Sequence, residues 1–349
     1  MEKKIKIAQI GINTNSHSND IFDTLKKQSE IYEIAGYVLP ENERKRLPQR
    51  ASGLERYREL TLDEIWNDPE IEAVTIETDE IYLTKYALAA AKAGKHIHME
   101  KPGGVELSDF QELIEVMKQT KKTLHFGYMY RYNPYVRELL RQIRDGELGS
   151  IISVEAQMNC LHAASVRQWL KSFPGGMMFF LGCHLVDLIF SIQGKPKRIL
   201  PFNKCSGIEG VTAEDFGMAV FEYENGVSFA KTSAVELGGF ARRQLVVSGT
   251  KKTVELNPLE WYLPDFSGLQ TQRVVRDTAF WHENYQKQWS ERFDRYEEMM
   301  RMFAEMVRGK RENPYTLEYE LELYKMILCA CGREDVLKME FPDSGEASE

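Results

Sequence analysis

Two short segments hold residue types that could do chemistry. The first is Glu100-Lys101-Pro102, which directly follows the apolar stretch HIHM. The second is the pair His184 and Asp187, which stand three residues apart in an apolar run and would share one face of a helix. A neutral imidazole can accept a proton near pH 7, and an ammonium group can stabilise a developing negative charge. Proton transfer and anion stabilisation are therefore the chemistry to look for.

A plain structural role competes with each of these hypotheses. Most lysines that follow a strand are simply solvated, and a lone histidine in an apolar helix is more often a satisfied core residue than a catalyst. Pro102 would stop the strand and fix the direction of the chain, which favours a Lys101 side chain that projects into a crevice. The polar partner and the paired glycines Gly175-Gly176 support the functional interpretation of His184, and both interpretations stay open.

The first third of the chain alternates strand and helix patterns. The strand patterns are KIKIAQIG, YEIAGYVL, EAVTIET, HIHM and TLHFGYM, and the helix patterns are DIFDTLKKQSE, TLDEIWND, IYLTKYALAAAKAG and DFQELIEVMKQT. This alternation predicts a doubly wound α/β domain of the Rossmann-like dinucleotide-binding type over residues 1–125. Ligands of such a sheet bind outside the carboxyl ends of its strands, where Lys101 is expected.

The pattern changes after residue 125. A helix is expected from Pro134 to Gly146, followed by the alternating strand IISVEAQMN. The strands AEDFGMAVFEY and VSFAKTSAV are joined by the turn Glu224-Asn225-Gly226, which is typical of a hairpin. Residues 126–340 are therefore predicted to form a second domain of the α+β class with an antiparallel sheet. The tail, residues 341–349, is predicted to be disordered.

The composition excludes several classes of protein. A formal net charge of −8 argues against a nucleic-acid partner, and no apolar run approaches the ~18 residues of a membrane span. The five cysteines are scattered without a CxxC pair, and the seven histidines show no HExxH spacing, so no metal is expected. The start MEKKIKIAQIG lacks a signal-peptide apolar core, and a cytoplasmic protein with reduced thiols is expected.

Several motifs in the same order resemble those of one family. They are the first strand with Gly11, AGKHIHMEKP, GYMYRYNPYVRELLRQIRDGELGSI, GGMMFFLGCHLVDL and AEDFGMAVFEYENG, and they span nearly the whole chain. Together they resemble the glucose–fructose oxidoreductase/inositol dehydrogenase family, also called Gfo/Idh/MocA. The resemblance implies that NAD or NADP binds in the first domain, and that a sugar or polyol binds against the sheet of the second.

The resemblance also implies roles for particular residues. Lys101 would lie beside the substrate hydroxyl and the nicotinamide, and His184 would be the general base while a hydride moves between a sugar carbon and C4 of the ring. The implied cofactor-binding residues are Gly11, Ile12, Asn13, Leu39, Glu41, Thr78, Glu100 and Lys101. Supporting or substrate-binding roles are expected for Asp187, Phe180, Arg131 and Trp169. Trp169 could stack on a sugar ring or simply fill the core.

This sequence departs from the family pattern at functional places. Of the usual GxGxxG motif, the segment from Gly11 to Ser16 keeps only the first glycine. Leu39 and Pro40 replace the acidic residue expected after the second strand, with Glu41 just beyond, so the choice between NAD and NADP stays open. Phe180 stands where many members have an aspartate, which makes the expected pocket more apolar.

Three functions remain as hypotheses. The leading one is an NAD(P)-dependent oxidoreductase that acts on a hydroxyl of a sugar, polyol or glycoside. The second is redox-assisted elimination on a glycoside with bound NAD, and the third is a catalytically silent or regulatory binding protein. Retention of Glu100, Lys101, Pro102, His184 and Asp187 favours the first two. A homo-dimer or homo-tetramer is expected because the second domain's sheet would leave one face open.

Overall fold

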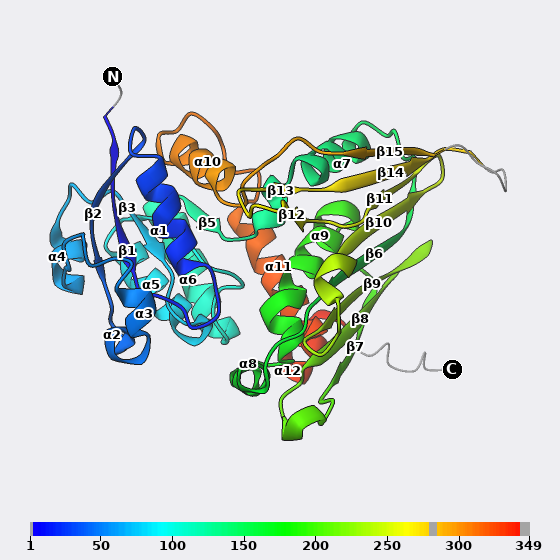
Figure 1. The fold of residues 1–349 in the computed structure, drawn as a ribbon, viewed down its shortest axis with the longest axis horizontal. Coiled ribbons are helices and arrows are strands. Elements are labelled where there is room, and N and C mark those ends of the chain that lie inside the picture. The colour runs from blue at the N-terminus through cyan, green and yellow to red at the C-terminus, as the bar shows by residue number, and fades with distance from the viewer. Residues whose placement is uncertain (1–2, 279–284, 343–349) are drawn as a thin grey trace. The chain divides into compact units, whose positions relative to one another are not determined.

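The computed structural model describes residues 3–278 and 285–342, and the chain divides into two compact units (Figure 1). The first unit holds Met1–Met129 and Tyr296–Tyr324, and the second holds Tyr130–Arg295 and Lys325–Glu349. The segment Tyr296–Tyr324 groups with the first unit, although the sequence analysis assigned it to the second domain. Of the tail expected at 341–349, residues 343–349 lie outside the described part of the chain.

The first unit is built on a five-stranded parallel sheet with the order β2-β1-β3-β4-β5, which confirms the doubly wound α/β prediction. The strands are β1 Ile5–Ile10, β2 Tyr32–Val38, β3 Ala73–Ile76, β4 His96–Met99 and β5 Leu124–Phe126. The connecting helices are α1 Ser18–Lys27, α2 Glu43–Arg46, α3 Pro48–Ala51, α4 Leu62–Asn67, α5 Leu83–Lys92 and α6 Leu107–Thr120. Gly94 follows α5 with a φ of 70°, the left-handed helix stop that the sequence predicts.

A polar row crosses the otherwise apolar interior of this sheet. Gln9, Thr75, His98 and His125 are register partners on neighbouring strands, and each is at most 2% exposed. The Nδ1 atoms of His98 and His125 lie 2.7 Å apart. Burial lowers the pKa of His98 to about 4, so this imidazole is neutral at physiological pH.

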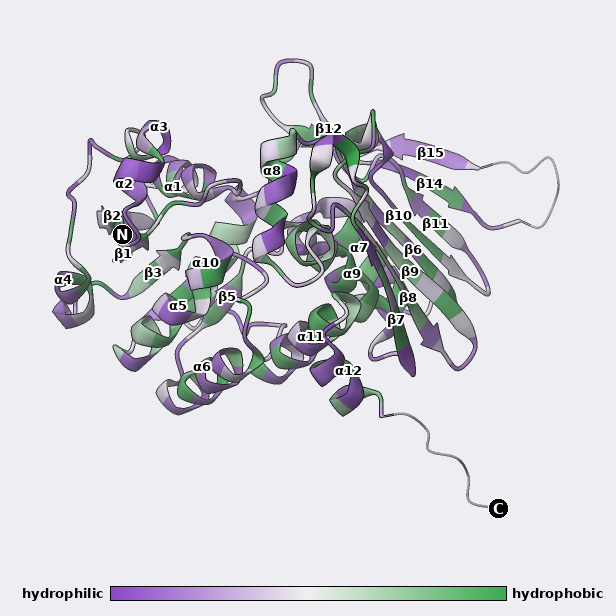
Figure 2. Cartoon of the chain, turned by 90° about the horizontal axis from the view of Figure 1, so that it is seen from below, coloured by the Kyte–Doolittle hydropathy of each residue, from purple (hydrophilic) through white to green (hydrophobic). Residues whose placement is uncertain are grey.

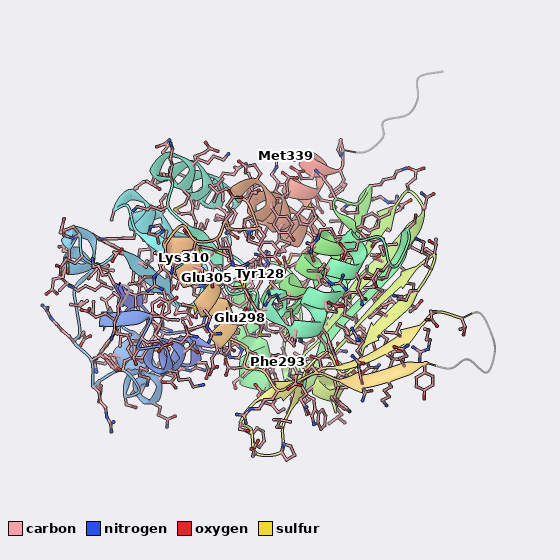
Figure 3. All side chains as sticks on the ribbon, turned by 90° about the horizontal axis from the view of Figure 1, so that it is seen from above. Tyr128, Phe293, Glu298, Glu305, Lys310 and Met339 are labelled. Atoms are coloured by element: carbon pink, nitrogen blue, oxygen red, sulfur yellow. The ribbon has the colours of Figure 1, made fainter. Side chains whose placement is uncertain are left out.

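Helices cover the sheet with their apolar sides. Figure 2 shows hydrophilic and hydrophobic residues alternating along α5 and α6, as amphipathic helices require. The helix α10, Glu297–Val307, also belongs to this unit, and the Tyr32 hydroxyl donates to the Met300 carbonyl at 2.5 Å. The labelled Glu298 and Glu305 of α10 pair with Arg301 and Arg311 (Figure 3).

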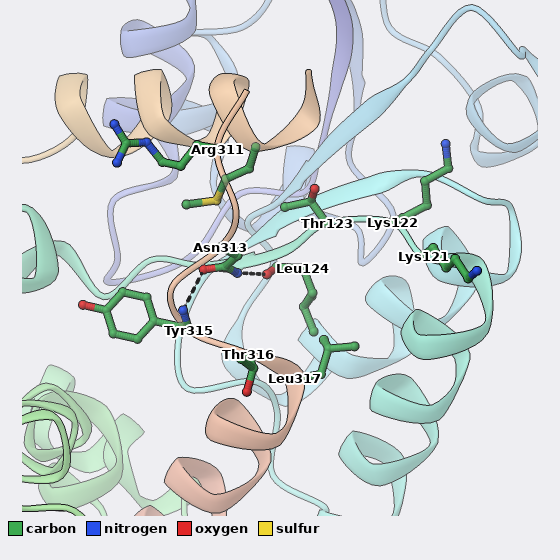
Figure 4. Close-up of a pocket in the computed structure, with 10 residues that line it drawn as sticks. Lys121, Lys122, Thr123, Leu124, Arg311, Asn313, Tyr315, Thr316 and Leu317 are labelled. Carbon is green, nitrogen blue, oxygen red and sulfur yellow. Dashed lines mark hydrogen bonds between the residues drawn. The ribbon is translucent and has the colours of Figure 1, made fainter. Parts of the chain in front are cut away.

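The chain after α10 is fastened to the edge strand β5. The Asn313 side chain donates to the Leu124 carbonyl at 2.9 Å and accepts from the Tyr315 N–H at 3.1 Å (Figure 4). The Tyr324 hydroxyl donates to the Gly104 carbonyl at 2.9 Å. These bonds show why the returning segment is an integral part of the first unit.

The second unit is built on an eight-stranded sheet with the order β15-β14-β11-β10-β6-β9-β8-β7. The strands are β6 Ile151–Asn159, β7 Arg198–Lys204, β8 Phe216–Tyr223, β9 Gly226–Ser233, β10 Gln244–Gly249, β11 Thr253–Leu256, β14 Gln272–Arg276 and β15 Gln286–Trp289. The hairpin of β8 and β9 is confirmed, and neighbouring strands are antiparallel except for β6 and β9, which are parallel. A small ribbon of β12 Trp261–Tyr262 and β13 Leu269–Gln270 lies outside this sheet.

The helices of the second unit are α7 Pro134–Arg144, α8 Ala164–Trp169, α9 Cys183–Gln193 and α12 Glu334–Glu340, and α11, Leu317–Ala330, ends in it. Pro134 takes the first position of α7, as the sequence predicts, and the Asn133 side chain caps the helix. Helix α9 packs on β6 and β9. Alternate residues of β8 are buried, while Phe216, Met218 and Val220 remain half-buried on the other face.

Two general properties follow from the described residues. Within them, no helix is long and apolar enough to cross a membrane. Across the same residues, His, Cys, Asp and Glu side chains form no group of three or more that could hold a metal ion.

Candidate functional site

Glu100 and Lys101 stand at the carboxyl end of β4, and both are buried, at 5% and 3% exposure. The Lys101 N–H donates to Oε1 of Glu100 at 2.8 Å, and the Ser16 hydroxyl donates to Oε2. A Cβ atom at Gly127, just after β5, would lie 3.1 Å from Glu100 Oε1. The Glu100 carboxylate is therefore held between the loop after β1 and the end of β5.

Two further carboxyl groups lie within electrostatic reach of the Lys101 ammonium. Glu77 and Glu80 follow β3 and are fully buried. Burial raises the pKa of Glu80 to about 7 and that of Glu77 well above its ordinary value, while the Lys101 charge opposes both shifts. Neither residue was predicted from the sequence to lie at the site. The stretch Glu77-Thr78-Asp79-Glu80, three acidic residues directly after a buried strand, was the available signal.

The loop after β1 lies against the loop after β3. Gly11 has a φ of 81°, and a Cβ atom there would lie 2.3 Å from Thr78 Cγ2, so only glycine fits. The buried Asn13 donates from its side chain to the Thr78 carbonyl at 3.1 Å. Its Oδ1 accepts the N–H groups of Asn15 and Ser16 at 2.8 and 2.9 Å. Asn13 thus occupies a glycine position of the family motif and satisfies N–H groups that precede α1.

Thr14 and Asp79 join the same two loops. The N–H and the hydroxyl of Thr14 both donate to Asp79 Oδ1 at 2.8 Å. Arg46 Nη1 lies 3.0 Å from Asp79 Oδ2, and Arg46 Nε donates to the Glu41 carbonyl at 3.1 Å. A backbone N–H, a hydroxyl and a guanidinium therefore converge on one carboxylate.

The positions after β2 are also in contact with protein groups. Leu39 packs against the apolar cluster that contains Ile12. The Glu41 carboxylate accepts from Lys85 at 2.7 Å and from the Tyr86 hydroxyl at 2.5 Å, both on α5. Glu43 is fully buried beside Gly11, and this burial raises its pKa to about 8.

In the second unit, His184 lies on α9 directly after the π-helical turn Met178–Gly182. The side chain is 3% exposed, and the Tyr130 ring meets the imidazole edge to face with centroids 5.5 Å apart. The Tyr130 hydroxyl donates to Glu260 Oε1 at 2.9 Å. Tyr130 therefore connects the imidazole with a buried charged cluster that sequence reasoning missed.

Glu260 is the centre of that cluster. Arg243 donates to Glu260 at 2.5 Å, and Arg295 donates to both carboxylate oxygens at 2.6 and 2.9 Å. Burial opposes ionisation, but the Arg295 and Arg243 charges outweigh it and lower the pKa of Glu260 to about 2. This carboxylate stays ionised through the physiological range of pH.

The remaining predicted residues of the second unit fall into two pairs. Arg131 donates to Asp187 through Nε at 3.0 Å to each oxygen and through Nη2 at 2.7 Å. Trp169 meets Phe180 at 90° with ring centroids 5.1 Å apart. The sequence grouped these four residues as supporting, and the structure brings each pair into contact.

Two cavities are lined by other residues. One of about 210 Å³ is in the first unit, where Lys121, Lys122 and Arg311 contribute cationic side chains near the amino end of β5 (Figure 4). The other, of about 420 Å³, is in the second unit and is lined by Trp261 and Trp289 among others. Neither cavity has a sequence-predicted site residue in its lining.

Comparison with known proteins gives matches to both parts of the chain. A family model described as "Oxidoreductase family, NAD-binding Rossmann fold" matches residues 5–128, and one described as "GFO/IDH/MocA C-terminal domain" matches residues 136–255. The 1,5-anhydro-D-fructose reductase of Ensifer adhaerens is 23% identical over 171 residues, 48% of this chain and 51% of the relative. The scyllo-inositol 2-dehydrogenase (NADP(+)) of Bacillus subtilis is 24% identical over 180 residues, 51% and 48% of the two chains.

A solved structure shows the same fold over nearly the whole length. The aldose–aldose oxidoreductase of Caulobacter crescentus, solved with glycerol, has a TM-score of 0.75 and 18% identity, covering 95% of this chain and 98% of its own. By sequence, the chain aligns with about half the length of the two curated relatives. Two adjacent models of one family match in the expected order, so the chain belongs to the Gfo/Idh/MocA family, with an NAD-binding Rossmann-type first domain.

Proposed function

We propose that the chain is an NAD(P)-dependent oxidoreductase that acts on a hydroxyl of a sugar, polyol or glycoside. The buried Glu100-Lys101 pair at the carboxyl end of β4 carries the proposal. An ammonium group at the carboxyl edge of a dinucleotide-binding sheet stands where ligands of such sheets bind. The names of the two relatives, a sugar reductase and a polyol dehydrogenase, support the same class of substrate.

The loop after β1 has the chemistry that a dinucleotide requires. Gly11 lets the backbone pass close to the loop after β3, and the donors of Thr14 and Arg46 surround an anion, which in this chain is the Asp79 carboxylate. Such donors suit a phosphate equally well. When bound, the oxidised nicotinamide would supply the hydride acceptor, so that a CH–OH group becomes a carbonyl.

The chain's own residues would handle the proton and the developing charge. In this proposal, the His184 imidazole takes the proton of the substrate hydroxyl. The Lys101 ammonium stabilises the alkoxide that develops as the hydride leaves, and Glu100 fixes Lys101 through its backbone N–H. Arg131 and Asp187 support α9, on which His184 stands.

We also propose a cytoplasmic homo-dimer or homo-tetramer. The five cysteines are free thiols, and four of them are buried, as suits a reducing compartment. The open face of the second unit's sheet keeps apolar side chains such as Phe216, Met218 and Val220 half-buried, which suits a contact with a second copy.

Turnover with variants tests the proposed roles. Purified protein is mixed with NAD⁺ or NADP⁺ and a panel of polyols, free sugars and glycosides, and formation of reduced nucleotide is followed by absorbance. We expect reduction with at least one compound, and Lys101→Ala and His184→Ala should each lower the rate roughly 10²-fold or more. Full activity in both variants would contradict the roles given to these residues.

A second function has one observation in its favour. The N–H groups of Thr14, Asn15 and Ser16 all donate to side chains of the protein itself. This favours a regulatory or catalytically silent binding protein, because a dinucleotide would have to replace those acceptors. A protein that binds nucleotide but reduces none with any compound of the panel would support this alternative.

A further inference from the structure

We propose that Asp79 is a built-in stand-in for a phosphate group of the cofactor and determines how tightly the dinucleotide binds. The inference rests on the proposed function, because it takes NAD or NADP as the ligand. In the nucleotide-bound state of this proposal, the Asp79 carboxylate no longer contacts Thr14 and Arg46, and a phosphate oxygen takes its place.

The donors around Asp79 are those of an anion site. Thr14 offers its N–H and its hydroxyl to one carboxylate oxygen, both at 2.8 Å, and Arg46 lies 3.0 Å from the other. The Glu41 carbonyl accepts from Arg46 Nε and thereby orients the guanidinium toward Asp79. A main-chain N–H, a hydroxyl and a guanidinium form the combination that proteins use for phosphate oxygens.

The place of Asp79 in the fold fits this role. Thr14 lies within the segment that corresponds to the GxGxxG motif, whose backbone approaches the pyrophosphate in dinucleotide-binding sheets. Asp79 itself is 6% exposed and sits one residue after Thr78, which Gly11 contacts closely. The carboxylate thus reaches the loop after β1 from the loop after β3.

A phosphate and Asp79 cannot use these donors together. Both are anions, and two like charges at a few ångströms repel strongly when they are shielded from water. Binding must therefore draw on the fraction of molecules in which Asp79 has already moved, and the apparent affinity falls by that fraction. An electrically neutral side chain at position 79 should remove most of this cost.

The test compares the affinity of the full chain with that of Asp79→Asn. The amide keeps an oxygen that can accept from Thr14 but loses the charge that repels a phosphate. We expect calorimetric titration to give dissociation constants for NADH and NADPH that are about tenfold lower in Asp79→Asn than in the wild type. The matched control is Asp109→Asn, which removes the same charge from an exposed position in the first turn of α6. Its affinities should equal those of the wild type.

Arg46→Gln provides a second comparison, at an arginine whose side chain is 40% exposed. If Arg46 passes from Asp79 to a phosphate, this substitution weakens nucleotide binding about fivefold or more, even in the Asp79→Asn background. An Arg46→Gln substitution without effect in that background would show that Arg46 serves Asp79 alone, and would overturn the inference.

The outcomes separate this inference from the proposed function. The stand-in role is overturned if the wild type binds nucleotide and Asp79→Asn does not bind it more tightly. It is also overturned if Asp109→Asn tightens binding equally. Both results leave the oxidoreductase proposal intact. The absence of binding in the wild type and in Asp79→Asn overturns both. Circular dichroism of each variant excludes misfolding as the cause.

Discussion

The Arg131 guanidinium and the Asp187 carboxylate form a bidentate ion pair in the interior of the second unit. Arg131 is 5% exposed and Asp187 is 1% exposed, so water screens neither charge. The pair joins the turn before α7 to α9, one helical turn after His184. It therefore fixes the position of α9 along this part of the unit.

We predict that Asp187→Ala lowers the free energy of unfolding by roughly 3–5 kcal/mol, because it leaves the Arg131 cation buried without a counter-charge. Urea denaturation followed by circular dichroism measures the change. Asp145→Ala is the control, because Asp145 pairs with Arg141 at the exposed end of α7 and its loss should cost less than about 1 kcal/mol. An equal loss of unfolding free energy in the two variants would show that the buried ion pair contributes no more to stability than the exposed one.

Phe180→Asp introduces the carboxyl group that many family members carry. The surroundings of Phe180 indicate that this substitution should lower the stability of the protein. Phe180 is 4% exposed and lies among the rings of Trp169 and Phe173. A carboxyl group there loses its hydration, so we predict a loss of about 2–5 kcal/mol of stability and an altered pH–rate profile. Denaturation and rate measurements over a range of pH test both. Phe180→Leu should leave the pH–rate profile unchanged, and a stable Phe180→Asp variant would refute the predicted cost.

Glu43 should make the protein less stable as the pH rises. Its pKa is about 8 in the fold and near the ordinary value of 4.5 in the unfolded chain. Between these values the unfolded chain releases the proton while the folded chain keeps it, so the stability contribution falls with rising pH and is fully present only below about pH 4.5. Glu43→Gln should therefore raise the free energy of unfolding relative to the wild type. This gain should be roughly 1–3 kcal/mol larger at about pH 8.5 than at about pH 5.

Urea denaturation of Glu43→Gln and the wild type at both pH values checks this prediction. The exposed Glu55, which pairs with Arg44, provides Glu55→Gln as the control without such a pH dependence. A Glu43→Gln variant whose stability follows that of the wild type at every pH would contradict the assignment of a buried, protonated carboxyl.

The sequence was sufficient for the fold class and for most elements of the first unit, whereas α8, α12, β7 and β12 to β15 of the second unit were not predicted. Helix ends at Gly94 and Pro134 follow from local backbone preferences, which act within a few residues. The parallel sheet and the β8–β9 hairpin follow from hydrophobic periodicity and turn chemistry. All of these signals are local, and local signals survive in a single sequence.

Partners distant in sequence could not be predicted in the same way. The alternation of apolar and polar residues in β6 shows which face of the sheet each residue occupies. It does not reveal that β9, some seventy residues further along the chain, lies parallel beside β6. The return of Tyr296–Tyr324 to the first unit depends on bonds such as that of Asn313 to the Leu124 carbonyl. No sequence motif predicts that a side chain will bind a backbone group far away in the sequence.

In the candidate site, too, local features were predicted and contacts between distant segments were not. Lys101 was predicted at a strand end, and its burial at the carboxyl edge of β4 agrees with that position. The acidic side chains of Glu77, Asp79 and Glu80 were missed, because a run of acidic residues is usually a solvated surface. Asp79 is buried against the loop after β1, whose Thr14 donates to it, and that loop was expected only to approach a cofactor.

Cofactor binding can be measured by direct titration of the purified chain with NADH and NADPH. The NAD-binding Rossmann-type domain and the donors of Thr14 and Arg46 predict saturable binding of at least one nucleotide, with one molecule per chain and a dissociation constant below about 1 mM. Calorimetry gives the stoichiometry, and tryptophan fluorescence gives an independent affinity. If calorimetry and fluorescence both detect no binding of either nucleotide at millimolar concentration, the chain is not an NAD(P)-dependent oxidoreductase.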